Sequence, residues 1–317
     1  MKSILITLGI LSAVLVPAGD RPHLPTTHSN AARLTDDALK DEKSTKVDPA
    51  DERSPAKPTA SVKRSGNEKT GLPVIDFKSR FGEYDGCFVI RSLNDGWTLR
   101  FNESQCVERL APCSTFKIFN SLAGLDSGVL SGPDHKMEWD GTKHWIKSWE
   151  QDHTLATAIR DSVVWYYQNL AEKIGEERMQ KYIDGCDYGN RDISGGIREF
   201  WLGSTLKISA DEQVRFLEKL YTDKLPFDRK SVETVKSIIV QRASGDWAFS
   251  GKTGSGLKNR KDPNGMEPNL GWFVGHVKNG DRQYVFAVNI KGDGAWGPKA
   301  REIADDLLVD LGLIEKK

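Results

Sequence analysis

Aromatic residues occupy only one part of this chain, and their distribution limits what can fold. No Phe, Trp or Tyr precedes Phe77, although the chain contains 12 Phe, 9 Trp and 7 Tyr. Residues 19–71 are rich in Pro, Ser, Thr and charges of both signs, so they cannot bury enough apolar surface to offset the entropy of ordering them. We therefore predict a disordered linker over 19–71 and one folded domain over 72–317.

The first 18 residues have the pattern of an export signal. Lys2 supplies positive charge, residues 4–16 form an apolar run, and Val16-Pro17-Ala18 offers small residues for cleavage. The run is shorter than the ~20 residues that span a bilayer, although an uncleaved anchor is the alternative. We expect residues 1–18 to be a signal peptide and the protein to be exported, periplasmic or extracellular.

The charge balance and the cysteines limit the partners. The chain has 45 basic and 45 acidic residues, which argues against nucleic acid or an anionic membrane as the main partner. Without a CxxC pair or histidines at ligand spacing, we predict no metal site. The four cysteines, which permit three sets of disulfide pairings, are Cys87, Cys106, Cys113 and Cys186. The predicted hairpin would bring Cys87 and Cys106 close together, so we expect a disulfide between these two. A monomer and a homodimer are equally compatible with the sequence.

The order of secondary-structure patterns predicts a sheet built from both ends of the chain. Residues 86–93 and 97–102 have the pattern of a hairpin, and residues 114–221 are mostly helical, including SVVWYYQNLAEKIG and SADEQVRFLEKLY. Strand patterns return in WAFSGKTG, GWFVGHV and QYVFAVNI, before a last helix in PKAREIADDLLVDLG. We predict a mixed α/β (α+β) fold: an antiparallel sheet flanked by helices, plus an inserted helical lobe, with a ligand cleft between them.

The segment PCSTFKIFN places Ser114 and Lys117 three residues apart, on one face if the segment is helical. A serine hydroxyl attacks only when a base takes its proton, and an ordinary lysine is already protonated. Apolar neighbours such as Phe116 and Phe119 suggest that the amine is buried, which disfavours its charged form. Because SxxK also occurs by chance on helix faces, the other motifs must decide.

Three further motifs follow in chain order: Ser162-Val163-Val164, Tyr188-Gly189-Asn190 and Lys252-Thr253-Gly254. Alone, they are explained by a helix N-cap, a turn and a strand end. An SxxK serine combined with a K-T-G strand is the signature of serine enzymes that bind β-lactams. From roughly Leu72 onward the chain resembles the class D β-lactamases (oxacillinases), and the match includes WDGTKHWIKSWEQDHTLATAI, RMQKYIDGCDYGNRDISGGIREFWL and SGKTGSG.

The resemblance implies the serine β-lactamase and penicillin-binding-protein fold, and a hydrolase that opens the β-lactam ring of penicillin-type antibiotics through an acyl-enzyme on Ser114. It also implies that Lys117 takes up carbon dioxide, supplied as bicarbonate, and serves as a carbamate base for acylation and deacylation. No other cofactor is implied. Trp201 matches the tryptophan whose indole N–H holds the carbamate, with plain core packing as the alternative.

The remaining roles are also implied by the resemblance. Ser162 relays a proton to the lactam nitrogen, and the backbone N–H groups of Ser114 and Ser255 form an oxyanion hole. The residues that bind substrate or shape its site are Val164, Lys252, Thr253, Gly254 and Ser255. The family often has an arginine for the substrate carboxylate near the start of the last helix. Here that position falls near Ala300, so either Lys299 or Arg301 takes the role.

Two other functions are compatible with these motifs. A penicillin-sensing receptor shares the fold and is acylated without turnover, but such domains normally follow several transmembrane helices and none is visible here. A cell-wall D,D-peptidase would act on peptidoglycan. The oxacillinase-like run around Trp201 favours the β-lactamase.

Overall fold

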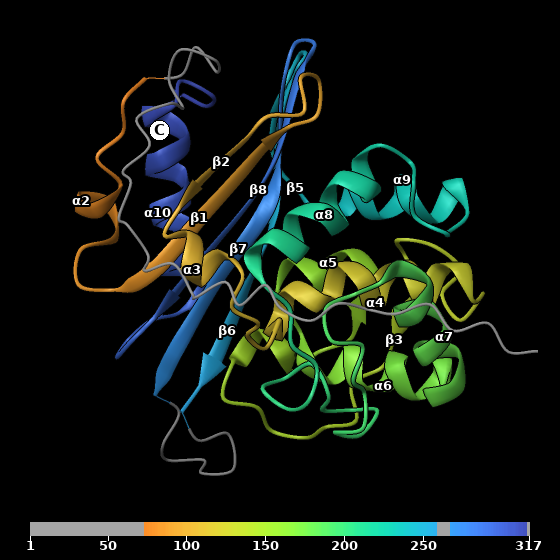
Figure 1. Ribbon diagram of the computed structural model, residues 1–317. Coiled ribbons are helices and arrows are strands. Elements are labelled where there is room, and N and C mark those ends of the chain that lie inside the picture. Colours follow the sequence, from red (N-terminus) through yellow and green to blue (C-terminus); the bar gives the residue numbers. More distant parts are fainter. Residues whose placement is uncertain (1–72, 259–266, 316–317) are drawn as a thin grey trace, which may run out of the picture. The chain divides into compact units, whose positions relative to one another are not determined.

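A six-stranded antiparallel sheet runs through the computed structural model, which describes residues 73–258 and 267–315 (Figure 1). The predicted signal peptide and linker lie outside the described residues. The strand order is β2-β1-β8-β7-β6-β5. The strands are β1 (Asp85–Ser92), β2 (Thr98–Phe101), β5 (Val240–Ser244), β6 (Trp247–Leu257), β7 (Pro268–Asn279) and β8 (Arg282–Lys291).

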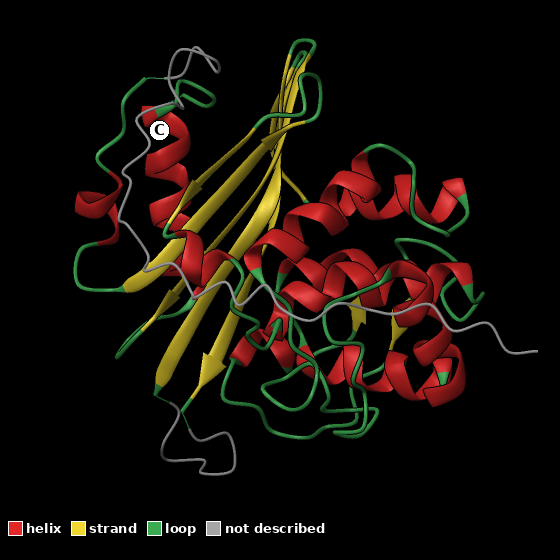
Figure 2. Cartoon of the chain, in the orientation of Figure 1, coloured by secondary structure: helices red, strands yellow, loops and turns green. Residues whose placement is uncertain are grey.

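The sheet combines both ends of the described chain, as the sequence predicted. The β1–β2 hairpin pairs with β8 from the C-terminal end, with Phe88 opposite Val288. The helical lobe lies in the sequence between β2 and β5 and packs against one face of the sheet, while α10 (Gly297–Asp310) covers the other (Figure 2).

The two faces of the sheet bury two separate cores. Successive side chains on a strand point to opposite faces. On β8, Val285 and Ala287 accordingly join the core under the helical lobe, whereas Phe286 and Val288 join the core under α10. This alternation fixes which residues of the K-T-G strand face the helical lobe.

The helical lobe contains most of the other elements. Its α8 (Ala210–Tyr221) begins with a capping box, in which Ser209 and Glu212 bond reciprocally. The other helices of the described chain, α10 apart, are α2 (Phe77–Phe81), α3 (Glu103–Cys106), α4 (Lys117–Asp126), α5 (Leu155–Arg160), α6 (Val164–Ile174), α7 (Glu176–Cys186) and α9 (Arg229–Ile238), of which α2 packs in the core under α10. Two short strands, β3 (Lys136–Met137) and β4 (His153–Thr154), pair with each other, and η2 (Lys147–Trp149) is a 3-10 turn.

One expected helix is divided in two. The sequence predicted a single helix from Ser114, but residues Cys113–Phe116 form a 3-10 turn, η1, and α4 begins at Lys117. Side chains three residues apart are eclipsed in a 3-10 turn. The division therefore brings Ser114 and Lys117 closer than an α-helix would.

The expected Cys87–Cys106 disulfide is wrong for this structure, in which both cysteines are buried and form no disulfide. The hairpin does bring the two thiols into hydrogen-bonding contact. However, the thiol of Cys106 also bonds to the carbonyl oxygen of Phe101, with 3.3 Å between sulfur and oxygen. The pair is thus satisfied by hydrogen bonds.

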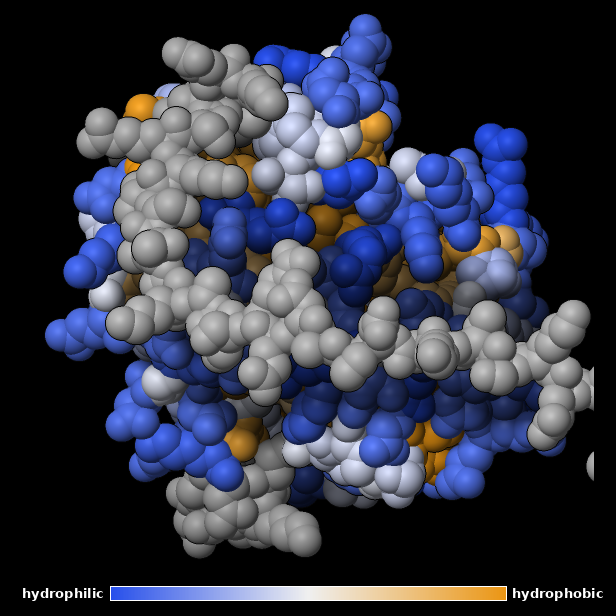
Figure 3. Space-filling view, in the orientation of Figure 1, coloured by the Kyte–Doolittle hydropathy of each residue, from blue (hydrophilic) through white to orange (hydrophobic). Residues whose placement is uncertain are grey.

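Neither a membrane-spanning helix nor a cluster of metal ligands is found among the described residues. No helix within 73–258 or 267–315 has the length and apolar character to cross a bilayer. The same residues contain no group of three or more His, Cys, Asp or Glu side chains placed to hold a metal ion. On the face in Figure 3, hydrophobic residues form separated patches among hydrophilic ones.

Candidate active site

The structure brings the predicted nucleophile and base into direct contact. Lys117 Nζ lies 2.7 Å from Ser114 Oγ, and the lysine side chain is fully buried. The turn is anchored from behind, because the backbone N–H of Cys113 donates to the carbonyl oxygen of Trp201 at 3.0 Å. Cys113 has a φ of +50°, a left-handed conformation that costs energy outside glycine. Ser114 is therefore held in place on a strained turn.

Aromatic rings surround the buried lysine. The ring of Tyr167 has its centroid 5.4 Å from Lys117 Nζ, and Phe116 stacks on Trp201 at 5.7 Å between centroids. Ser121 Oγ donates to the Lys117 carbonyl oxygen and lies 2.9 Å from the Tyr167 hydroxyl. The amine thus sits in a largely apolar pocket that contains few polar groups.

Trp201 presents a polar atom to this interior without using it. Its side chain is fully buried, and its Nε1 has no hydrogen-bond partner in the described structure. Leaving a buried donor unpaired costs about 1–3 kcal/mol, and such groups are rare in folded proteins. The indole N–H can therefore donate to an acceptor that enters this interior.

A second serine–lysine pair joins the Ser162 segment to the K-T-G strand. Lys252 Nζ lies 3.0 Å from Ser162 Oγ, and also contacts Thr253 through its carbonyl oxygen (3.0 Å) and its hydroxyl (3.5 Å). The pKa of Lys252 falls from 10.5 to about 7, chiefly because burial disfavours the charged amine and secondly because of the positive charge of Arg301. Near neutral pH this amine can both hold and release a proton, which suits a proton relay through Ser162.

The K-T-G strand leaves part of its edge open beside the nucleophile. β5 pairs with β6 only at Trp247–Ser250, so the following residues have no strand on that side. At Gly254 a Cβ would come within 2.9 Å of the Pro112 carbonyl oxygen and 3.2 Å of the Thr115 nitrogen. The absence of a side chain lets β6 pack directly on η1, which brings the backbone of Ser255 near Ser114.

The residues at the start of α10 are not equivalent. Ala300 is fully buried in the core, and the partly buried Lys299 pairs with Glu302 at 2.9 Å. Arg301 instead donates to Gln241 on β5 and lies over the Phe273 ring. The structure therefore brings Arg301 to the sheet, and it does not bring Lys299 there.

Two residues in this neighbourhood were missed in the sequence. Tyr167 lies on α6, which begins after Ser162, and no motif in the sequence relates it to Lys117. Gln241 belongs to no motif, and only the pairing of β5 with β6 reveals it. Val164, predicted to wall the site, is the first residue of α6 and is half-buried against the lobe core.

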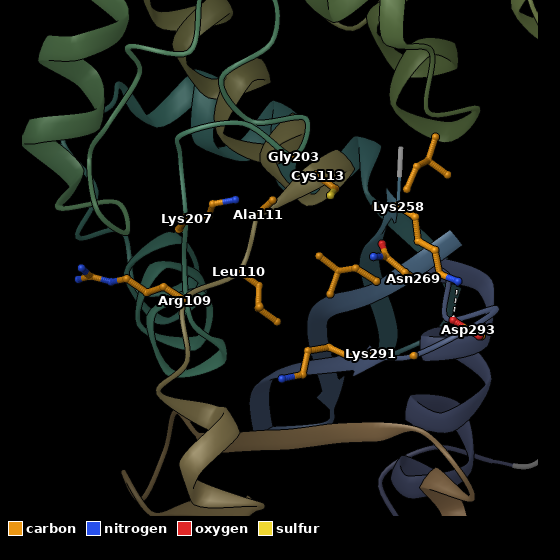
Figure 4. Close-up of a pocket in the computed structure, with 14 residues that line it drawn as sticks. Arg109, Leu110, Ala111, Cys113, Gly203, Lys207, Lys258, Asn269, Lys291 and Asp293 are labelled. Atoms are coloured by element: carbon orange, nitrogen blue, oxygen red, sulfur yellow. Dashed lines mark ion pairs between the residues drawn. The ribbon is translucent and has the colours of Figure 1, made fainter. Parts of the chain in front are cut away.

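A cavity of about 470 Å³ lies next to the nucleophile turn (Figure 4). It borders Cys113, but none of the site residues predicted from the sequence lines it. Its rim is basic, and Lys258 pairs with Asp293 at 2.7 Å. The other labelled side chains around it are Arg109, Leu110, Ala111, Lys207, Asn269 and Lys291.

This arrangement is the fold of the serine β-lactamases and penicillin-binding proteins. It combines the antiparallel sheet, the helical lobe and the two serine–lysine pairs, and comparisons with known proteins give the same assignment. A model of the penicillin binding protein transpeptidase domain matches residues 67–309. The chain is 42% identical over 251 residues to the probable beta-lactamase YbxI of Bacillus subtilis (strain 168), covering 79% of this chain and 90% of that protein. The crystal structure of a class D beta-lactamase from Bacillus subtilis matches with a TM-score of 0.71 at 40% identity, covering 76% of this chain and 98% of that one.

Within that fold, the chain belongs to the class D β-lactamase family of serine hydrolases. It is also similar to a regulatory protein: BlaR1 of Bacillus licheniformis is 36% identical over 247 residues, which cover 77% of this chain and 40% of that protein.

Proposed function

We propose that this protein opens the ring of penicillin-type β-lactams by way of an acyl-enzyme on Ser114, with carbamylated Lys117 as general base. One observation carries the proposal: a fully buried lysine amine lies 2.7 Å from the serine oxygen, in a site where the buried indole N–H of Trp201 has no partner. The carbamate would supply an anionic oxygen that accepts a proton, which the amine alone does poorly when charged.

Acylation then follows from the positions of the other groups. Ser114 loses its proton to the base and attacks the lactam carbonyl carbon, while the backbone N–H groups of Ser114 and Ser255 stabilise the oxyanion. The C–N bond of the ring breaks, and Ser162 delivers a proton to the departing nitrogen. Lys252 replaces that proton through its 3.0 Å contact with Ser162. Before the second half, the base on Lys117 gives its proton to solvent and Lys252 regains one from solvent. The base then takes a proton from water, the resulting hydroxide attacks the ester carbonyl carbon, the C–O bond to Ser114 breaks, and the base returns the proton to Ser114 Oγ.

Lys117 can be tested directly. We expect purified protein to turn over a chromogenic cephalosporin many times, and added bicarbonate to stimulate it. Lys117→Ala should lose most acylation and nearly all deacylation, as followed by the mass of the acylated chain. Lys181→Ala is a matched control, because Lys181 is exposed and pairs only with Glu177 on the surface of α7. Hydrolysis by Lys117→Ala at a near wild-type rate would refute the assigned base.

A receptor is the second candidate, favoured by the similarity to BlaR1. It would give a single stoichiometric burst and a long-lived acylated chain in the same assay. A D,D-peptidase would instead release the terminal D-alanine of a peptidoglycan stem peptide.

We also propose that the protein is exported, because of the apolar run at residues 4–16. The mass of the mature N-terminus in a cell fraction tests this. A chain that keeps Met1 and stays in the cytoplasm would contradict it.

A further inference from the structure

The start of α10 places Arg301 beside the K-T-G strand. The backbone N–H of Gly297 donates to Ser255 Oγ at 3.0 Å, and a Cβ at Gly297 would lie 2.9 Å from Thr253 Cβ. Arg301 follows Gly297 by four residues, so both occupy one face of the helix. Its guanidinium carbon lies 5.6 Å from the centroid of the Phe273 ring, and Phe273 pairs in register with Thr253. The guanidinium therefore lies over β6 at the level of the motif.

Gln241 holds this guanidinium from the other side. Its Oε1 accepts a hydrogen bond from Arg301 Nη1 at 3.0 Å, while its Nε2 donates to the carbonyl oxygen of Gly251 at 3.1 Å. Gly251 directly precedes Lys252. The amide of Gln241 thus links the Arg301 side chain to the strand that carries the motif, at the point where β5 stops pairing.

The bond to Gln241 uses one of the five N–H donors of Arg301, and contact with Phe273 uses none. Donors of a planar guanidinium remain for an anion and match a carboxylate in a bidentate pair. The positive charge also reaches Lys252, whose pKa it lowers. Lys299 lacks these contacts, because its amine pairs with Glu302 and its side chain is 40% exposed.

We propose that Gln241 is a positioning residue, which holds the guanidinium of Arg301 at the open edge of β6 to bind the carboxylate of the β-lactam substrate. The anchor then comes from the residue after Ala300 and depends on a side chain of a different strand. The proposal rests on the proposed β-lactam chemistry and adds how the substrate anion is recognised.

The test compares a penicillin with its carboxylate methyl ester, which lacks the anion. For the free acid, we expect Gln241→Ala to raise KM roughly tenfold, the size of one hydrogen bond to a charged group, with kcat within about twofold of wild type. Arg301→Gln should raise it further, and the double variant should match Arg301→Gln alone. Each variant should affect the reaction of the ester much less than that of the acid. Arg301→Gln should still change the ester reaction in part, because the charge of Arg301 also lowers the pKa of Lys252. Arg282→Gln, at the exposed start of β8, is the control for loss of one arginine.

Several results would overturn the proposal. Equal losses on acid and ester would show a merely structural role, and multiplied effects in the double variant would show that Gln241 does not act through Arg301. A KM increase in Lys299→Gln but not in Arg301→Gln would assign the anchor to Lys299. The rate of Ser114 acylation, followed by mass, gives the same comparison if the chain does not turn over. A wild-type chain that is never acylated would refute the proposed function, and this proposal with it.

Discussion

Trp201→Phe offers a sharp test of the carbamate, because it removes one N–H and keeps an aromatic ring. The ring of Trp201 stacks on Phe116 at 5.7 Å between centroids, and phenylalanine can retain much of that contact. Trp201 is fully buried, so no water replaces the lost donor. A hydrogen bond to a charged group contributes about 1.5–3 kcal/mol, and each 1.4 kcal/mol is about a factor of ten. The bicarbonate concentration that gives half-maximal activity should therefore rise roughly ten- to hundredfold.

The assay measures initial rates of cephalosporin hydrolysis in CO₂-depleted buffer against added bicarbonate. Carbon-13 NMR with labelled bicarbonate reports carbamate occupancy independently of turnover. Trp272→Phe is the matched control, because Trp272 is equally buried but its Nε1 already donates to the Ala111 carbonyl oxygen at 3.0 Å. That variant should lose stability without changing the bicarbonate midpoint. An unchanged midpoint in Trp201→Phe, with the fold intact, would show that the indole N–H does not hold the base.

Two predictions concern the stability of the scaffold. Burial is the main cause that lowers the pKa of His276 from 6.5 to about 4, so the folded protein favours the neutral imidazole. The free energy of unfolding should therefore fall as the pH drops from 6.5 toward 4, by about 3 kcal/mol in total. His276→Gln should flatten the dependence of melting temperature on pH in that window, and an equally steep dependence would show that another group is responsible. Gly189 has a φ of +58°, and a Cβ at this position would lie 2.1 Å from the Lys207 carbonyl oxygen. Gly189→Ala should therefore lower the free energy of unfolding by more than the ~1–2 kcal/mol that left-handed strain alone costs. Gly196→Ala, with a φ of +95° and no atom within 4 Å, isolates the strain, and equal losses in both would exclude the clash.

Patterns that depend on neighbouring residues were readable in the sequence. The hairpin, the helix α8 and the strand patterns of β6 to β8 all appear where local spacing predicted them. The SxxK spacing was sufficient to pair Ser114 with Lys117, although the turn is 3-10 instead of α-helical. The chain order of the motifs was enough to indicate the family, because each motif is a short run of neighbouring residues that can be recognised without the fold.

Contacts between distant segments were decided only by the tertiary structure. Lys252 meets Ser162 across 90 positions of the chain, and Gln241 meets Arg301 across 60. Neither pair has a local signal, because strand pairing and the packing of α10 on the sheet create both. Likewise, the hairpin pattern correctly predicted that Cys87 and Cys106 lie close together, but only the folded geometry shows that they are free thiols. Sequence therefore determined which chemical groups are present and which local turns they occupy, whereas burial and strand register determined which of them touch.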